Sequence, residues 1–88
     1  MAEVEILSDS VNQAVLRHPG RKFPGVLVQG DTLHALCCQA DRACERIGPS
    51  GAGFAETNRL RNGLWTLLNH YKVTLGEHDI PLPFSEIP

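Results

Sequence analysis

The 88-residue sequence has no apolar run long enough to cross a membrane, since a spanning helix needs about 20 mostly apolar residues. Its first five residues carry neither the basic segment nor the apolar segment of a secretion signal. Cysteine is scarce and odd in number, and in a helix Cys37 and Cys44 would lie too far apart to form a disulfide. These absences predict a protein of the reducing cytoplasm that does not insert into membranes.

The sequence also lacks the motifs of familiar enzymes and metal sites. It has no phosphate-binding loop with its lysine, no nucleophile elbow and no Cys-x-x-Cys pair. His34 and Cys38 share one face of a predicted helix, but no further ligand accompanies them to complete a metal site. We therefore expect no catalytic residues, no metal, no cofactor and no enzymatic activity.

Positive charge is not in excess, because the net charge is −2. Nucleic acid is therefore not an expected partner. The charges are nevertheless unevenly placed: all eight basic residues lie between Arg17 and Lys72, and the two ends of the chain are acidic. This distribution favours acidic ends that fold back over a basic middle.

What is present is an ordinary globular composition, with 42% apolar residues, which predicts a single α+β domain over residues 1–88. Three segments near the start have the pattern of short strands: Val4–Leu7, Ala14–Arg17 and Val26–Gln29. The last of these is β-branched and bounded by glycines, so it is the strongest strand candidate. Two prolines in the 18–25 segment indicate a structured loop or a wide hairpin tip between the second and third strands.

After Gly30 the apolar period changes to that of a helix, with Asp31 as the expected N-cap and Gly48-Pro49 as the stop. The apolar face of this first helix comprises Leu33, Leu36, Cys37, Ala40, Cys44 and Ile47. A second helix is expected to begin between residues 54 and 57 and to end between 72 and 76. Its Gly63 weakens the helix by about 1 kcal/mol relative to alanine, and we interpret it as a point where the first helix crosses closely.

These elements predict a small antiparallel sheet of about three strands followed by two helices, both packed on one face of the sheet. Residues 80–84 contain two prolines with apolar residues at alternate positions, which indicates an extended C-terminal tail laid over the core.

The most unusual feature is a basic loop, and its candidate binding residues are Arg17, His18, Arg21, Lys22 and Phe23. Cations around an aromatic ring suit an acidic protein surface, or a phosphate with a stacked base. The alternative is a solvated loop tip with Phe23 packed inward. Trp65, the sole tryptophan, is a further candidate: it is either a residue at the margin of the core or an exposed anchor for a partner.

The segment Leu16–Leu33 resembles a family of small bacterial proteins of unknown function. That family has the signature Pro-Gly-Arg-x-x-Pro-Gly-Val-x-x-Gln-Gly-Asp-Ser/Thr-Leu, which residues 19–33 match. The resemblance implies a compact bacterial domain and supplies no catalytic residues.

Two functional hypotheses follow. The first is a non-catalytic module that binds another protein, of the immunity or antitoxin kind, and a homodimer is also compatible with so small a chain. The second is a binder of a small ligand or nucleotide that uses the basic loop. It predicts a concave site beside residues 17–23, whereas the first predicts an exposed apolar or charged patch.

Overall fold

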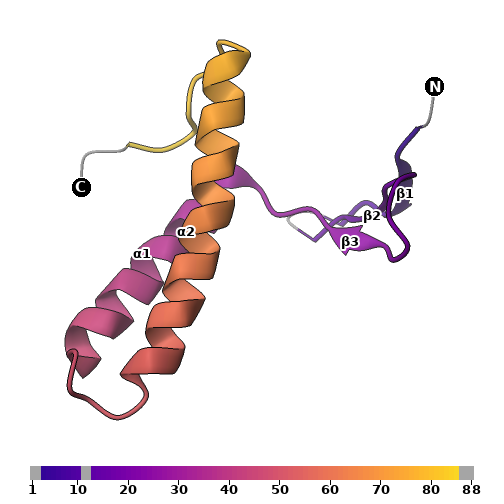
Figure 1. Ribbon diagram of the computed structural model, residues 1–88. Helices are drawn as coiled ribbons and strands as arrows, with labels where there is room; N and C mark the ends of the chain where they lie inside the picture. Colours follow the sequence, from indigo (N-terminus) through magenta and orange to yellow (C-terminus); the bar gives the residue numbers. More distant parts are fainter. Residues whose placement is uncertain (1–2, 11–12, 86–88) are drawn as a thin grey trace.

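The computed structural model describes residues 3–10 and 13–85. Its elements, in chain order, are β1 (Glu5–Ser8), β2 (Val15–Arg17), β3 (Gly25–Val26), α1 (Gly30–Ile47) and α2 (Phe54–Glu77) (Figure 1). The predicted fold class is confirmed: a three-stranded antiparallel sheet is followed by two helices.

The sheet has the strand order β1-β2-β3, and its register places Ile6 opposite Leu16 and Leu16 opposite Gly25. Residues directly opposite one another share a face of the sheet, so Ile6 and Leu16 lie on one face and the opposed pair Val15 and Val26 on the other. The third strand is shorter than predicted. The Leu27 amide still donates to the Ala14 carbonyl (2.8 Å), but β2 offers no partner to the residues that follow, and the chain leaves the sheet.

The core lies between the two helices, where Leu33 and Cys37 of α1 meet Leu68 of α2. Further along α1, Ala40 and Cys44 are also buried. These α1 side chains are mostly small, which lets the two helices approach closely. The extended tail joins this core as predicted, because Phe84 packs against the cluster and its ring stacks on that of His34, with centroids 4.2 Å apart.

The helix ends agree with the sequence in part. Gly48 has the positive φ (76°) of a helix-terminating glycine, and α2 begins at Phe54 as expected. The predicted N-cap is wrong: the cap residue of α1 is Gln29, whose carbonyl accepts from the Leu33 amide. The Asp31 carboxylate lies inside the first turn and accepts from the neighbouring Thr32 amide.

The role predicted for one glycine is wrong, and the role of another was missed. Gly63 does not mark a close crossing of the helices, because nothing lies within 4 Å of where its Cβ would stand. The close approach is instead at Gly30, where a Cβ would lie 2.2 Å from the ring of Tyr71. Gly30 therefore allows the start of α1 to dock on the second half of α2.

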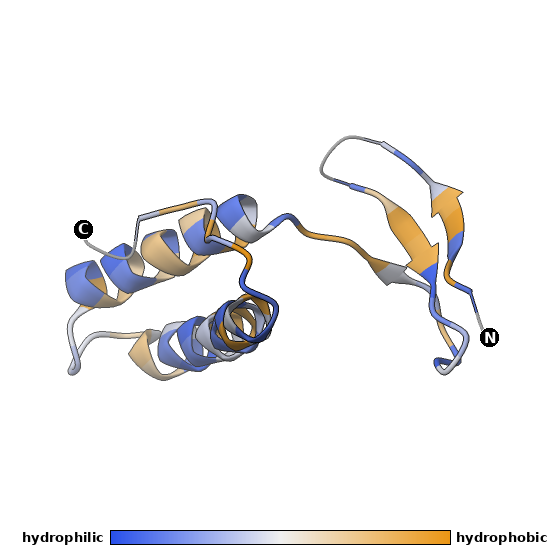
Figure 2. Cartoon of the chain, turned by 90° about the horizontal axis from the view of Figure 1, so that it is seen from above, coloured by the Kyte–Doolittle hydropathy of each residue, from blue (hydrophilic) through white to orange (hydrophobic). Residues whose placement is uncertain are grey.

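The expected packing of both helices on one face of the sheet is also wrong. The two helices pack on each other, and in the described part of the chain no strand makes a close backbone contact with a helix. Residues 27–29 carry the chain away from the sheet, which stands beside the helical pair (Figures 1 and 2). The molecule is consequently elongated, with extents of 50 × 30 × 22 Å and a radius of gyration of 15.7 Å. A compact domain of this length would have a radius of gyration of about 12 Å.

Candidate functional site

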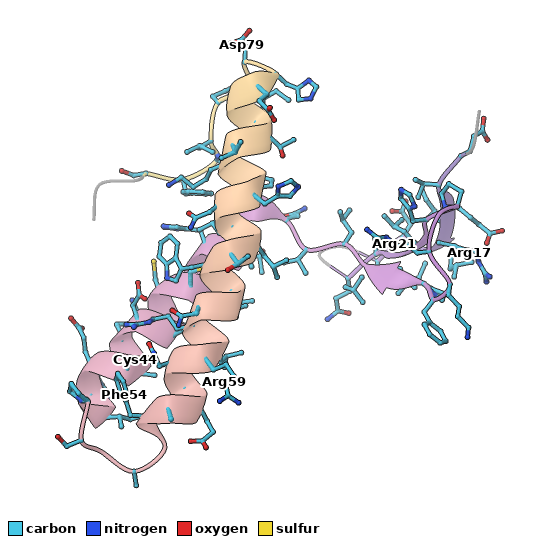
Figure 3. The ribbon with its side chains drawn as sticks, viewed as in Figure 1. Arg17, Arg21, Cys44, Phe54, Arg59 and Asp79 are labelled. Atoms are coloured by element: carbon cyan, nitrogen blue, oxygen red, sulfur yellow. The ribbon has the colours of Figure 1, made fainter. Side chains whose placement is uncertain are left out.

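The basic loop connects β2 to β3 and lies at the end of the molecule remote from α2, where Arg17 and Arg21 are labelled in Figure 3. The hairpin brings the five predicted loop residues into one segment of the surface, and all five are exposed. The prediction of a hairpin tip is therefore confirmed, while a binding role for these residues stays a prediction.

His18 stabilises the loop from within. Its carbonyl accepts a hydrogen bond from the Arg21 amide (3.0 Å), and its Nδ1 accepts one from the Gly20 amide (3.0 Å). The imidazole thus closes a tight turn through one ring nitrogen. These two hydrogen bonds fix the backbone of the turn that places Arg21 and Lys22 at the tip of the loop.

Arg17 lies at the base of the loop, where its Nε is 2.9 Å from Oε1 of Glu5 on β1. Both side chains are more than half exposed, so this ion pair adds at most about 1 kcal/mol to stability. The acidic N-terminal segment does fold onto one basic residue here. On the C-terminal side, Asp79 follows the end of α2 and stands apart from the loop (Figure 3).

Phe23 points away from the protein, with 74% of its surface exposed. The interpretation in which this ring packs inward is therefore wrong. The Nζ of Lys22 lies 5.4 Å from the ring centroid, within the range of a cation–π contact. The tip consequently presents an aromatic face and positive charge together, a combination that suits contact with a partner.

The sheet beside the loop exposes large apolar side chains. They are Val4, Ile6, Leu7, Val26 and Leu27, each between 46% and 64% exposed. Figure 2 shows these apolar strands standing clear of the helices. The alternation along the strands predicted which residues share a face, but it contained no signal that the helices would leave that face uncovered.

Trp65 lies on the helical pair, apart from the loop. Its Nε1 donates to Oδ1 of Asp41 on α1 (3.0 Å), and its half-buried ring packs against the core cluster. The structure thus favours the first of its two interpretations, a residue at the margin of the core. The partner Asp41 was missed, since the two residues are 24 positions apart.

Two cysteines and a histidine lie close together on α1. Cys38 Sγ lies 3.6 Å from His34 Nε2, and the His34 ring stacks on that of Phe84. Burial raises the pKa of the Cys37 thiol, and the nearby Asp41 carboxylate and Cys38 raise it further. A thiol with a raised pKa stays protonated and is a poor nucleophile.

Within residues 3–10 and 13–85, no group of three or more His, Cys, Asp or Glu side chains is arranged to hold a metal ion. Neither helix in that part of the chain has the length and apolarity needed to span a bilayer.

Comparison with known proteins places the chain in a family. No curated protein and no solved structure matches it. The model of one family, described as a family of unknown function (DUF6959), matches residues 1–84, which is nearly the whole chain. The chain therefore belongs to DUF6959, a family whose function is unknown.

Proposed function

We propose that this protein is a non-catalytic module of the bacterial cytoplasm that binds another protein through its sheet and basic loop. The bacterial origin is proposed from the resemblance of residues 19–33 to the signature of small bacterial proteins. We propose further that the module is of the immunity or antitoxin kind. The partner presents an apolar patch bordered by carboxylates.

The observation that carries the proposal is the uncovered sheet. Three strands of four, three and two residues have little stability alone. Ala14 is the buried apolar residue of this region, whereas Ile6 and Val26 are more than half exposed. Because Ile6 and Val26 lie on opposite faces of the sheet, a partner that covers either face would remove apolar surface from water, at about 25 cal/mol per Å².

The loop adds positive charge and an exposed aromatic side chain beside the apolar residues of the sheet. Arg21 and Lys22 provide charge that attracts an acidic surface, and Phe23 provides an aromatic anchor of the kind found at the centre of interfaces. Because Arg17 is already paired with Glu5, the charge available to a partner is that of Arg21 and Lys22.

The test is capture of a partner from a bacterial lysate, followed by reconstitution of the purified pair. The variant Arg21→Ala/Lys22→Ala removes the loop charge and leaves the Arg17–Glu5 pair intact. Arg42→Ala/Arg46→Ala is the matched control, since it removes the same charge from exposed positions on α1. We expect the loop variant to weaken binding at least about tenfold, and the control to bind like the original chain. Equal binding by both variants would contradict the role of the loop.

The runner-up function is a binder of a small phosphorylated ligand. The observation that favours it is the contact of Lys22 with Phe23, since a cation beside an aromatic ring suits a phosphate and a stacked base. Mass spectrometry of the purified protein tests this reading. A phosphorylated molecule that accompanies the original chain but not Arg21→Ala/Lys22→Ala would replace the protein-binding proposal.

A further inference from the structure

One side of α2 carries an apolar groove. The groove is lined by Glu56, Arg59, Leu60, Gly63, Leu64 and Leu67. Leu60 and Leu67 are 61% and 60% exposed, although each is large and apolar. In Figure 3 the Arg59 side chain projects from this side of the helix. A helix normally turns its polar side to water, so this face lacks a cover.

Gly63 forms the floor of this groove, and nothing within the chain explains it. A Cβ at this position would meet no atom within 4 Å, and the residue sits in the interior of a helix, where glycine is a poor helix former. A glycine that is unneeded for internal packing is typical of a place where another chain approaches the backbone closely.

The residues along this face lie in line along the helix, and Leu60 and Leu67 are the two large apolar residues among them. Positions 56, 60, 63, 67, 70 and 74 of α2 are separated alternately by four and three residues. This alternation keeps side chains in line along one side of a helix that packs against a second helix. A second hollow adjoins this face at Leu67, His70 and Thr74, and it is also lined by Leu33 of α1 and by Val26 and Val28, which precede α1. This line of residues, the seam, runs along most of the 24-residue helix.

We infer that a second copy of this chain binds here, with the two α2 helices antiparallel about a two-fold axis near residue 65. In this register Leu67 of each copy enters the notch above Gly63 of the other. Leu60 packs on the His70 ring of the other copy, and Glu56 meets its Thr74 hydroxyl. The surface is thus complementary to itself, as a two-fold interface requires.

The parallel arrangement is disfavoured by the same residues. With the helices parallel, the two Gly63 positions would face each other and leave a void. The two Glu56 carboxylates would also lie together, and like charges in contact oppose association. The antiparallel register replaces the void with Leu67 and keeps the two Glu56 carboxylates apart. Charge and shape therefore favour the same orientation.

The exposed area of the chain is large enough for such an interface. The single chain exposes 6951 Å², whereas a compact monomer of this mass would expose about 5,100 Å². The excess, roughly 1,900 Å², includes the uncovered sheet. A stable complex needs about 800 Å² from each partner, so the chain exposes more surface than a compact monomer by an amount that exceeds one such interface. The inference is independent of the proposed function of the loop.

The first experiment measures the molar mass of the full chain by sedimentation equilibrium at micromolar concentration. Leu60→Lys/Leu67→Lys places two charges in the seam. Leu36→Lys/Ile80→Lys places two charges at exposed apolar positions outside the seam. We expect the original chain and the control to be dimers, and the seam variant to dimerise at least about a hundredfold more weakly. A monomeric original chain, or a seam variant that remains a dimer of equal strength, would overturn the inference.

A third variant separates dimerisation from folding. Gly63→Leu adds a good helix former where no atom of the same chain is in the way, so the single chain should unfold at a temperature no lower than the original. The leucine would fill the notch that receives Leu67, so the dimer should dissociate. Loss of the dimer with an unchanged or raised melting temperature, measured at dilution, supports the inference. An intact dimer contradicts it.

The register is tested by cross-linking in a Cys38→Ser background, where the remaining cysteines, Cys37 and Cys44, are buried. Thr66 is exposed and lies next to the two-fold axis, so Thr66→Cys should form a disulfide between copies upon mild oxidation. Asn62→Cys, exposed one turn away and off the seam, is the control and should stay reduced. Equal cross-linking at both positions, or cross-linking of Asn62→Cys alone, would show that this register is wrong.

Discussion

The helical pair and the sheet contain similar proportions of apolar residues, yet the two regions differ in how far these side chains are buried. On the helices, Leu33, Cys37 and Leu68 are almost completely buried against one another. On the sheet, Ile6 and Val26 are 60% and 64% exposed. The difference indicates that the stability of the single chain resides in the helical pair, whereas the sheet presents its apolar side chains to other molecules.

The comparison also shows that burial and regular structure are separate properties. The strands have a defined register and a β-bulge between Ile6 and Ser8, so they are ordered without a cover. Their order comes from backbone pairing and from the Arg17–Glu5 contact, both of which are exposed to water. Four substitutions test whether the two regions differ as described, from the largest expected effect to the smallest.

Leu68→Ala should have the largest effect. Leu68 is 0% exposed in the core of the helical pair, and truncation of a buried leucine costs about 2–5 kcal/mol of unfolding free energy. Urea unfolding followed by the fluorescence of Trp65, which reports on the same helices, gives this value. A loss below about 1 kcal/mol would mean that the helical pair is not the stable part of the chain.

Gly30→Ala should come next, because its new Cβ would collide with the Tyr71 ring. Overpacking of this kind costs about 1–3 kcal/mol. Gly76→Ala is the matched control: it also lies in a helix, but its Cβ would meet nothing within 4 Å. The control should be neutral or stabilising by up to about 1 kcal/mol. Similar losses in both variants would show that the Tyr71 contact is unimportant.

Trp65→Phe should have a smaller effect. The substitution keeps an aromatic ring but removes the hydrogen bond from Nε1 to Asp41, which is worth about 0.5–1.5 kcal/mol. A double-mutant cycle with Asp41→Ala, measured by circular dichroism during thermal unfolding, isolates this coupling. Additive losses would mean that the two helices are not joined through this pair.

Ile6→Ala should have the smallest effect on the single chain. Its side chain is already 60% exposed, so we expect the unfolding free energy to change by no more than about 0.5 kcal/mol. The measurement is the same urea titration as for Leu68→Ala. A loss as large as that of Leu68→Ala would show that the face is covered in solution and would remove the contrast between the two regions.

The sequence predicted the local features of this fold well. Asp31, Gly48 and the apolar period between them located α1 closely, because helix ends are determined by nearby backbone chemistry. The basic loop was found for a similar reason, since its residues are contiguous. The length of β3 was not predicted, because it depends on where β2 offers a partner.

Relations between distant segments could not be predicted. Alternation along residues 4–7 predicted that Val4 and Ile6 share a face, but not that the helices would leave both side chains exposed. The position of Gly63 in the chain did not reveal which side of α2 it occupies relative to α1. The contact of Trp65 with Asp41 depends on the angle between two helices, which neither residue determines by itself.

The elongated shape has a consequence for the way this protein behaves in a column. A compact protein with a radius of gyration of 15.7 Å would contain about 180 residues, which is close to twice the length of this chain. One copy should therefore emerge from gel filtration near a compact marker of double its mass, and a pair of copies should emerge earlier still. The number of chains in the eluted species must accordingly be obtained from its molar mass, which light scattering measures independently of shape.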